Sequence, residues 1–226
     1  MKLSVIIPCH NESSTIKIIV DRTIKVPVEK QIIVVDDFST DGTREIIKEH
    51  VEPLVDKVIY HDKNVGKGMA VRSAINEISG DITVIQDADL ELDPQDFLKL
   101  IEPIRDGEEQ VIYGARRGDE PFLSYPLFHL GRKVLTILTN FLYGQKLTDM
   151  ETCYKVFDSR LLKSIPLNCK GFEFEPEITA KVAKRGIKIK EIPINYSPRN
   201  FEEGKKIRWI DGIVALWILF KYRFTN

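Results

Sequence analysis

The sequence predicts an α/β protein with a mainly parallel sheet and helices on both faces. Three observations support this class. Short apolar runs alternate with amphipathic segments along the first half of the chain, and acidic or polar residues directly follow several of the apolar runs. The third observation is the composition: 226 residues with 43% hydrophobic and 30% charged side chains are enough for a folded core and exclude disordered, collagenous and coiled-coil classes.

The predicted elements follow one another in regular order. Five apolar runs bounded by turn residues are predicted strands, at residues 3–8, 31–36, 58–61, 82–86 and 111–114. Between them, apolar residues at 3.6-residue spacing after Ser, Asp or an Asn/Gly turn predict helices, at residues 13–25, 41–50, 67–78 and 93–104. This order implies right-handed crossovers, and in such sheets ligands bind beyond the carboxyl ends of the strands.

The second half of the chain has a different pattern. Residues 121–146 are rich in Phe, Leu and Tyr, which predicts an apolar helix that covers the ligand-binding face, contacts lipid or belongs to the core. Residues 173–185 predict a further amphipathic helix, and residues 187–195 alternate like an edge strand closed by Pro193. We expect all these elements to form a single domain.

The charge distribution is more informative than the formal net charge of −1. Residues 181–226 hold 11 Lys and Arg against 4 Asp and Glu, and such a block either attracts an anionic partner or forms a solvated helix face. Its uncharged run, residues 212–220, is far shorter than the ~20 residues of a membrane-spanning helix. The aromatic residues beside Arg208, Lys221 and Arg223 instead suit a helix in the headgroup layer of a membrane.

Several classes of protein are not expected. Three cysteines, odd in number and far apart, argue against a disulfide framework and fit a reducing cytosol. The apolar N-terminus is too short for a secretory signal. The segment Gly66-Lys67-Gly68 lacks the spacing of a Walker A loop, and no G-x-G-x-x-G follows the first strand, which argues against an NAD-dependent dehydrogenase.

The strongest chemical signal is a pair of carboxylates after the fourth predicted strand. Asp87 and Asp89 stand at i and i+2, where both side chains can reach one site as the chain leaves the sheet. Mg²⁺ and Mn²⁺ accept such carboxylates and complete their shell with water and phosphate oxygens, whereas an isolated D-x-D is most often a solvated turn. Asp36 and Asp37 repeat the arrangement one crossover earlier. They either bind a base and ribose, or the motif only leads into a turn in which Ser39 or Asp41 caps the next helix.

Four motifs occur in a fixed order: S-V-I-I-P-C-H-N-E, V-V-D-D-F-S-T-D-G-T, N-V-G-K-G-M-A-V-R and D-A-D-L. Together they resemble glycosyltransferase family 2 over nearly the whole chain, which implies the Rossmann-like GT-A fold of nucleotide-diphosphosugar transferases. Residues 66–72 and T-D-M-E-T-C-Y-K at residues 148–155 resemble the branch of dolichyl- and polyprenyl-phosphate mannosyl- and glucosyltransferases. The resemblance implies inverting transfer of a hexose from a nucleoside-diphosphate sugar to a polyprenyl or dolichyl phosphate.

The resemblance also implies roles for individual residues. Nucleotide-sugar binding is expected at Pro8, Asn11, Glu12, Asp37, Lys67 and Asp87. The metal, Mg²⁺ or Mn²⁺, is expected at Asp87 and Asp89, with Glu91 as a candidate third ligand. Catalytic positions are expected at Asp149, Glu151 and one of Arg116 and Arg117, between which the sequence does not choose. The acceptor phosphate is expected near Arg132, Arg199, Lys205 and Lys206.

The chemistry of sugar transfer explains these residue types. The departing diphosphate develops charge that a divalent cation neutralises. A hydroxyl acceptor needs a base, but a lipid monophosphate, with a second pKa near ~6, is already mostly ionised at neutral pH and needs cations to position it. The basic C-terminal block therefore favours a lipid phosphate.

These inferences give a complete expectation. Residues 1–115 bind the nucleotide sugar, residues 116–200 bind the acceptor, and residues 201–226 form a basic loop and an amphipathic helix. The protein is expected to be cytoplasmic and peripheral at the inner face of the membrane, without a nucleic-acid partner. The donor stays open between UDP-glucose and GDP-mannose, with residues 66–72 favouring a UDP-hexose. A transferase with a soluble or glycan acceptor and a non-catalytic nucleotide-sugar-binding subunit remain alternatives.

Overall fold

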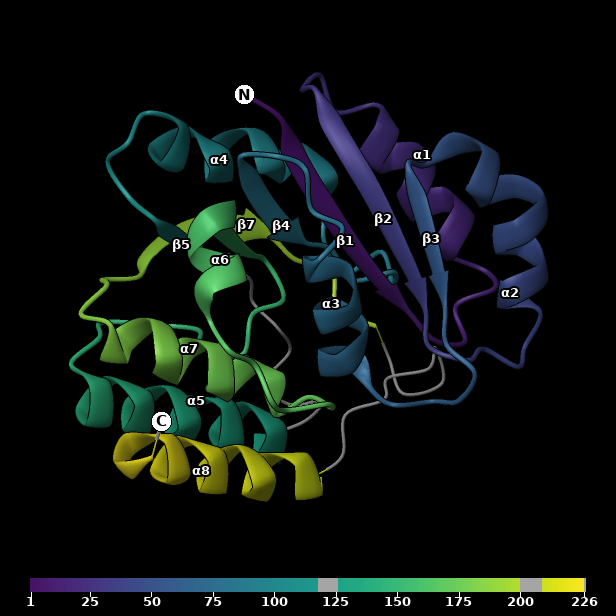
Figure 1. The fold of residues 1–226 in the computed structure, drawn as a ribbon. Helices are drawn as coiled ribbons and strands as arrows, with labels where there is room; N and C mark the ends of the chain where they lie inside the picture. Colours follow the sequence, from purple (N-terminus) through teal and green to yellow (C-terminus); the bar gives the residue numbers. More distant parts are fainter. Residues whose placement is uncertain (118–125, 200–208, 226) are drawn as a thin grey trace.

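The structure, a computed structural model, describes residues 1–117, 126–199 and 209–225, and for residues 117, 126–129 and 209 the backbone alone. Within these residues one seven-stranded sheet has the order β3-β2-β1-β4-β6-β5-β7 (Figure 1). The strands are β1 (Leu3–Cys9), β2 (Lys30–Asp36), β3 (Lys57–Tyr60), β4 (Ile82–Ile85), β5 (Val111–Arg117), β6 (Lys155–Asp158) and β7 (Lys190–Asn195). The five predicted strands are confirmed as β1 to β5.

The helices cover both faces of this sheet. They are α1 (Ile16–Ile24), α2 (Thr43–Ile46), α3 (Lys67–Ile75), α4 (Phe97–Arg105), α5 (Pro126–Tyr143), α6 (Ser159–Ser164), α7 (Phe174–Lys184) and α8 (Trp209–Phe224). The helix expected at residues 41–50 is α2 followed by a π-helical turn, Ile47–Val51. In the described ranges, no helix has both the length and the apolar character that a membrane span needs.

Strand side chains alternate between two cores, which is why the strands read as continuous apolar runs. In β1, Leu3, Val5 and Ile7 pack on the side of α1 and α4, whereas Ile6 packs on the side of α3, α6 and α7. All four side chains are fully buried. The predicted α/β class with helices on both faces is therefore confirmed.

Strand β6 was not predicted, and it changes the topology. It runs antiparallel to both β4 and β5, so β5 lies beyond β6 and not beside β4. Because β6 is reversed, its amino end lies at the edge where the parallel strands have their carboxyl ends. Residues 149–154, which precede β6, are thereby delivered to that edge.

The edge strand predicted at residues 187–195 is confirmed as β7, which contains Pro193 and ends at Asn195 but begins at Lys190. Strand β7 pairs with β5 alone, and its register continues through Pro193, opposite Ala115, to Asn195. A proline is accepted because one side of an edge strand has no neighbour to which it must donate. Ile194 and Asn195 carry the chain to the same sheet edge, where Arg199 follows.

Two glycines allow α3 to begin directly against the loop before α7. At Gly66, with φ +97°, an added Cβ would lie 2.5 Å from the carbonyl oxygen of Lys170. At Gly68 it would lie 2.8 Å from Cβ of Phe174. The amide of Met69 donates to the Lys170 carbonyl at 2.9 Å, so the two backbones are in direct contact.

This contact predicts that Gly66→Ala lowers the free energy of unfolding by about 2–5 kcal/mol, from a left-handed backbone and an overpacked Cβ together. Gly107→Ala is the matched control, because Gly107 also has positive φ (+75°) but no atom near its Cβ position. It should cost only about 1 kcal/mol. Urea unfolding measures both, and equal losses would contradict the close packing at Gly66.

Candidate active site

One edge of the sheet gathers most of the predicted site residues. The parallel strands β1, β2, β4, β5 and β7 end there and the reversed β6 begins there. The side chains brought to this edge, or to the start of α3 beside it, are Asn11, Glu12, Asp37, Lys67, Asp87, Asp89, Glu91, Arg116, Asp149, Glu151 and Arg199. Pro8 instead lies inside β1, opposite Val35 and beyond the last residue that pairs with β4.

Asp87 is paired with Lys67, whose side chain is 13% exposed. Its Oδ1 lies 2.8 Å from Nζ of Lys67, which also lies 3.0 Å from Oε1 of Glu175. Oε2 of Glu175 in turn lies 2.6 Å from Nζ of Lys155. Burial by itself raises the pKa of Asp87, but the adjacent Lys67 ammonium lowers it below its ordinary value.

Asp89 lies in a second charged group with Arg199. The guanidinium of Arg199 donates to both oxygens of Glu12, at 2.9 and 3.0 Å, and to Oδ2 of Asp89 at 3.3 Å. Burial, Asp87 and Glu91 raise the pKa of Asp89 to about 7, against the opposing effect of Arg199. The negative charges of Asp87 and Glu91 therefore disfavour ionisation of Asp89 even though the Arg199 guanidinium is adjacent.

This donor set fits Mg²⁺ or Mn²⁺. Asp87 and Asp89 repel each other's charge, and a divalent cation relieves the repulsion that otherwise favours a proton. Among the residues that the structure describes, no three Asp, Glu, His or Cys side chains form a complete metal cage. Mg²⁺ and Mn²⁺ do not need such a cage, because they keep several water ligands and bind substrate phosphates. Glu91 accepts a hydrogen bond from the backbone amide of Arg199 at 2.9 Å, and its role as third ligand stays a prediction.

A third group joins β5 to the loop before β6. Nε and Nη2 of Arg116 donate to the two oxygens of Asp149 at 2.6 and 2.7 Å. Burial raises the pKa of Asp149, but Arg116, with a smaller effect of Arg132 on α5, lowers it below its ordinary value. Of Arg117 only the backbone is described, so the structure assigns this pairing to Arg116 and leaves the choice of catalytic arginine a prediction.

The carboxylate of Asp37 has hydrogen-bond partners within the protein. Its two carboxylate oxygens accept the backbone amides of Val65 and Gly66 at 2.9 and 2.7 Å, and His61 Nδ1 lies 2.7 Å away. Asp37 therefore fixes the turn that starts α3. Its predicted contact with the nucleotide is not needed to explain its burial. Asp36 likewise pairs with Arg44 at 2.6 Å, so its burial also has a structural explanation.

The loops that follow β1, β2 and β4 carry backbone strain. Asn11, Phe38 and Leu90 have φ of 52°, 60° and 64°, in the left-handed region. Such conformations cost roughly 1–3 kcal/mol for bulky residues and gather at ligand sites. Asn11 is stabilised by its Oδ1, which accepts the amide of Thr40 at 2.8 Å. No sequence pattern indicated the strain at Phe38 and Leu90.

Sequence reasoning missed Glu175 and gave Lys155 no role beyond its place at the end of the motif at residues 148–155. The only signal for Glu175 was three glutamates, Glu173, Glu175 and Glu177, around the start of a predicted helix, and acidic residues there are ordinarily explained by the helix dipole. Of the predicted acceptor residues, Arg132 lies half-buried on α5 and Arg199 lies among carboxylates, whereas Lys205 and Lys206 lie outside the described residues.

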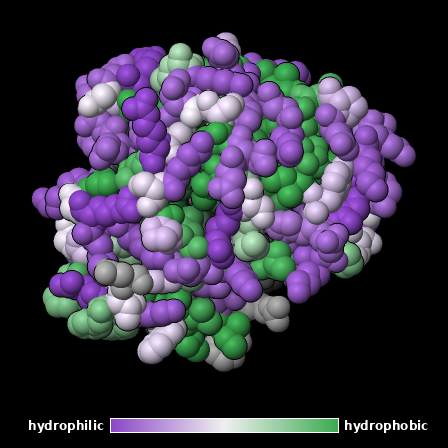
Figure 2. Space-filling model, in the orientation of Figure 1, coloured by the Kyte–Doolittle hydropathy of each residue, from purple (hydrophilic) through white to green (hydrophobic). Residues whose placement is uncertain are grey.

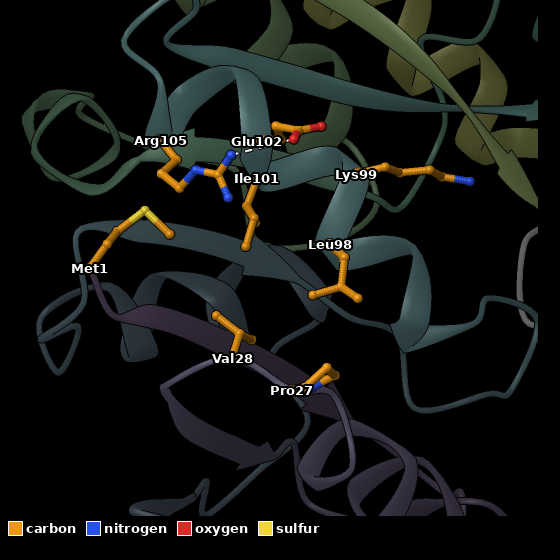
Figure 3. Close-up of a pocket in the computed structure, with 8 residues that line it drawn as sticks. All are labelled: Met1, Pro27, Val28, Leu98, Lys99, Ile101, Glu102 and Arg105. Atoms are coloured by element: carbon orange, nitrogen blue, oxygen red, sulfur yellow. Dashed lines mark hydrogen bonds and ion pairs between the residues drawn. The ribbon is translucent and has the colours of Figure 1, made fainter.

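A groove of about 500 Å³ lies elsewhere, at the amino ends of β1 and β2 (Figure 3). Its lining includes Met1, the Pro27-Val28 turn and the α4 side chains Leu98 and Arg105. It contains none of the strand-end carboxylates, so it is not the candidate active site.

Comparison with known proteins agrees with this geometry. The sequence model described as Glycosyl transferase family 2 matches residues 4–165. Glycosyltransferase AglJ of Haloferax volcanii is 29% identical over 225 residues, 98% of this chain and 72% of the relative. Undecaprenyl-phosphate mannosyltransferase of Micrococcus luteus is 27% identical, over 94% of this chain and 90% of the relative. Two other relatives are matched over only 49% and 59% of their length.

Among solved structures, glucosyl-3-phosphoglycerate synthase from Mycobacterium tuberculosis, in complex with Mn²⁺, UDP and phosphoglyceric acid, has the same fold. The TM-score is 0.76 at 22% identity, over 100% of this chain and 79% of the other. The family match, the GT-A fold and the acidic strand-end site agree with one another. The chain therefore belongs to glycosyl transferase family 2 and is a glycosyltransferase.

Proposed function

We propose that this enzyme transfers a hexose from a nucleoside-diphosphate sugar, UDP-glucose or GDP-mannose, to a polyprenyl or dolichyl phosphate. The transfer inverts the anomeric carbon and uses Mg²⁺ or Mn²⁺. The observation that supports a lipid acceptor is an apolar surface on α5 and α8, because the opposite face of α5 contacts the site. The name of the Micrococcus luteus relative, undecaprenyl-phosphate mannosyltransferase, supports the same class of acceptor.

The α5–α8 surface consists of exposed apolar side chains at helical spacing. Its members are Leu130, Val134, Ile137 and Phe141 on α5, and Ile210, Ile213, Val214, Trp217, Phe220 and Phe224 on α8. Phe141 is 84% exposed and Trp217 66%. Figure 1 shows the two helices side by side, and Figure 2 shows hydrophobic side chains at the lower edge, where α8 lies. Spacings of three and four residues place each set on one helix face.

The opposite face of α5 contacts the site. Oγ1 of Thr136 accepts the amide of Met150 at 3.2 Å, and Arg132 is close enough to Asp149 to lower its pKa. The hydroxyl of Tyr143 donates to the Leu219 carbonyl at 2.6 Å and ties α5 to α8. A lipid tail along the apolar surface would thus have its phosphate within about one helix diameter, roughly 10 Å, of the charged site.

The residues divide into three proposed roles. Asp87 and Asp89, with Glu91 as third candidate, hold the cation, which when bound neutralises charge on the departing diphosphate. The nucleotide sugar is held by Pro8, Asn11, Glu12, Asp37 and Lys67. The ionised acceptor phosphate needs no base, and the cations proposed to position it are Arg116 or Arg117, Arg132, Arg199, Lys205 and Lys206. We also propose that the enzyme works as a peripheral protein at the cytoplasmic membrane face.

Glu151 is the one catalytic candidate with an unusual titration. Its Oε1 is buried and has no hydrogen-bond partner among the described residues. Burial raises the pKa of Glu151 to about 7; Lys155 and Arg116 oppose the shift, and Glu175 and Asp149 add to it. Near neutral pH this carboxyl is partly protonated, so it can donate to a sugar hydroxyl or a phosphate oxygen.

The first test offers the purified enzyme UDP-glucose or GDP-mannose with Mn²⁺ and either a short polyprenyl phosphate or 3-phosphoglycerate. We expect sugar transfer to the lipid phosphate, and at least about a 100-fold loss in Asp89→Ala because charge on the leaving group is no longer neutralised. Asp106→Ala is the control and should keep full activity, because Asp106 is an exposed aspartate directly after α4. Transfer to 3-phosphoglycerate alone would favour a soluble acceptor, and nucleotide binding without transfer would favour a binding subunit.

The second test measures cosedimentation with vesicles of neutral and anionic phospholipid. The double substitution of Phe141→Ser with Trp217→Ser should weaken binding by at least about tenfold, because each exposed aromatic ring loses its burial in the lipid. Leu54→Ser removes an apolar side chain that is 47% exposed away from the surface and should leave binding unchanged. Equal binding by all three proteins would remove the support for a membrane-bound acceptor.

The third test follows stability against pH. The folded-state pKa of Glu151 lies above the ordinary value of 4.5, so the folded state binds this proton more tightly than the unfolded chain does. The stability contributed by the group is therefore present below about pH 4.5 and is lost as the pH rises through about 7. At pH 8 Glu151→Gln should be more stable than wild type by roughly 1–3 kcal/mol, and the difference should shrink at pH 5. An equal difference in the free energy of unfolding between Glu151→Gln and wild type at both pH values would show that Glu151 ionises normally.

A further inference from the structure

We propose that Glu175 is a positioning residue for the divalent cation, acting through Lys67 to keep Asp87 available as a ligand. The inference rests on the metal site of the proposed function and goes beyond it, because Glu175 lies on α7 and was assigned no role by its sequence pattern.

The geometry is a row of four alternating charges that is partly exposed at Asp87 and Lys67 and buried at Glu175 and Lys155. Lys67 lies between Asp87 and Glu175, with distances of 2.8 and 3.0 Å from its Nζ. Glu175 lies between Lys67 and Lys155, and the side chains of Glu175 and Lys155 are 5% and 0% exposed. The two carboxylates and two ammonium groups neutralise one another. In a poorly hydrated environment this balance is required, because an unpaired charge is costly.

The balance decides how strongly Lys67 opposes a cation at Asp87. With Glu175 ionised, the Lys67 ammonium divides its attraction between two carboxylates. If Glu175 were neutral, the same ammonium would have only Asp87 as a charged partner. The group of four side chains would then carry a net positive charge. A divalent cation at Asp87 would then have to displace a tighter ion pair and would face an uncompensated ammonium. Glu175 therefore favours metal binding although it does not contact Asp87.

Glu175 is well placed to perform this role. It is the second residue of α7, and its carbonyl accepts the hydroxyl of Thr179 at 2.7 Å, so the backbone beneath it is held in a regular helix. Its second partner, Lys155, also donates to the carbonyl of Met150 at 3.0 Å. The same carboxylate thus connects the D-x-D turn to the loop that carries Asp149 and Glu151.

The experiment measures binding of Mn²⁺ alone, with free Mn²⁺ detected by electron paramagnetic resonance and with no nucleotide or lipid present. Glu175→Gln should raise the dissociation constant by about 10-fold or more, the usual effect of losing an outer-shell partner. Glu175→Asp keeps the charge and should stay within roughly threefold of wild type. Glu177→Gln is the matched control: this buried glutamate on the same helix pairs with Lys181 at 2.7 Å, so its loss should lower stability and leave Mn²⁺ affinity unchanged.

A second variant, expected to change Mn²⁺ affinity in the opposite direction, tests the inference if Glu175→Gln does not fold. Lys67→Met removes the ammonium beside Asp87 and should tighten Mn²⁺ binding, which a merely structural role would not produce. Unchanged affinity in Glu175→Gln, equal weakening in Glu177→Gln, or weaker binding in Lys67→Met would each overturn the inference. Failure of lipid-dependent transfer with these Mn²⁺ results intact would instead overturn the proposed acceptor, because the binding assay contains neither sugar nor lipid.

Discussion

The pairing of buried carboxylates with cations at one edge of the sheet is the constraint on which the site depends. Parallel strands end at the same edge, so the chain that leaves them delivers acidic residues into a small volume. Asp87 is paired with Lys67, Glu12 with Arg199 and Asp149 with Arg116. Where pairing is incomplete, as at Asp89 and Glu151, the pKa rises to about 7. The site holds negative charge ready for a cation without becoming unstable.

The cations in these pairs come from elements that a simple βαβ order does not bring together. The reversed strand β6 places Lys155 and the 149–154 loop at the edge, and β7 leads to Arg199. Helix α7 adds Glu175 between Lys67 and Lys155. The second half of the chain thus completes a charge pattern that the first half begins. It also supplies α5 and α8, which pack against each other and expose apolar side chains.

Local patterns predicted much of this architecture. Strands β1 to β5 and most of the helices between them follow from apolar runs and 3.6-residue periodicity, and the position of Asp87 and Asp89 follows from the end of β4. Strand β6 was missed because no turn signal separates it from α6, which Asp158 caps by accepting the amide of Leu161. The last strand was predicted as an edge strand ending at Asn195, and Pro193 is accepted in it because an edge strand has no neighbour on one side.

The sequence by itself determined the α/β class, the strand-end location of the acidic residues and the family motifs, because these depend on periodicity and on residues a few positions apart. Only the tertiary structure decided which cation meets which carboxylate. Glu12 and Arg199 are 187 positions apart, and Lys67 meets Glu175 only where the start of α3 packs on the loop before α7. Such pairings depend on strand direction and on backbone contact, and the spacing of residues along the chain predicts neither.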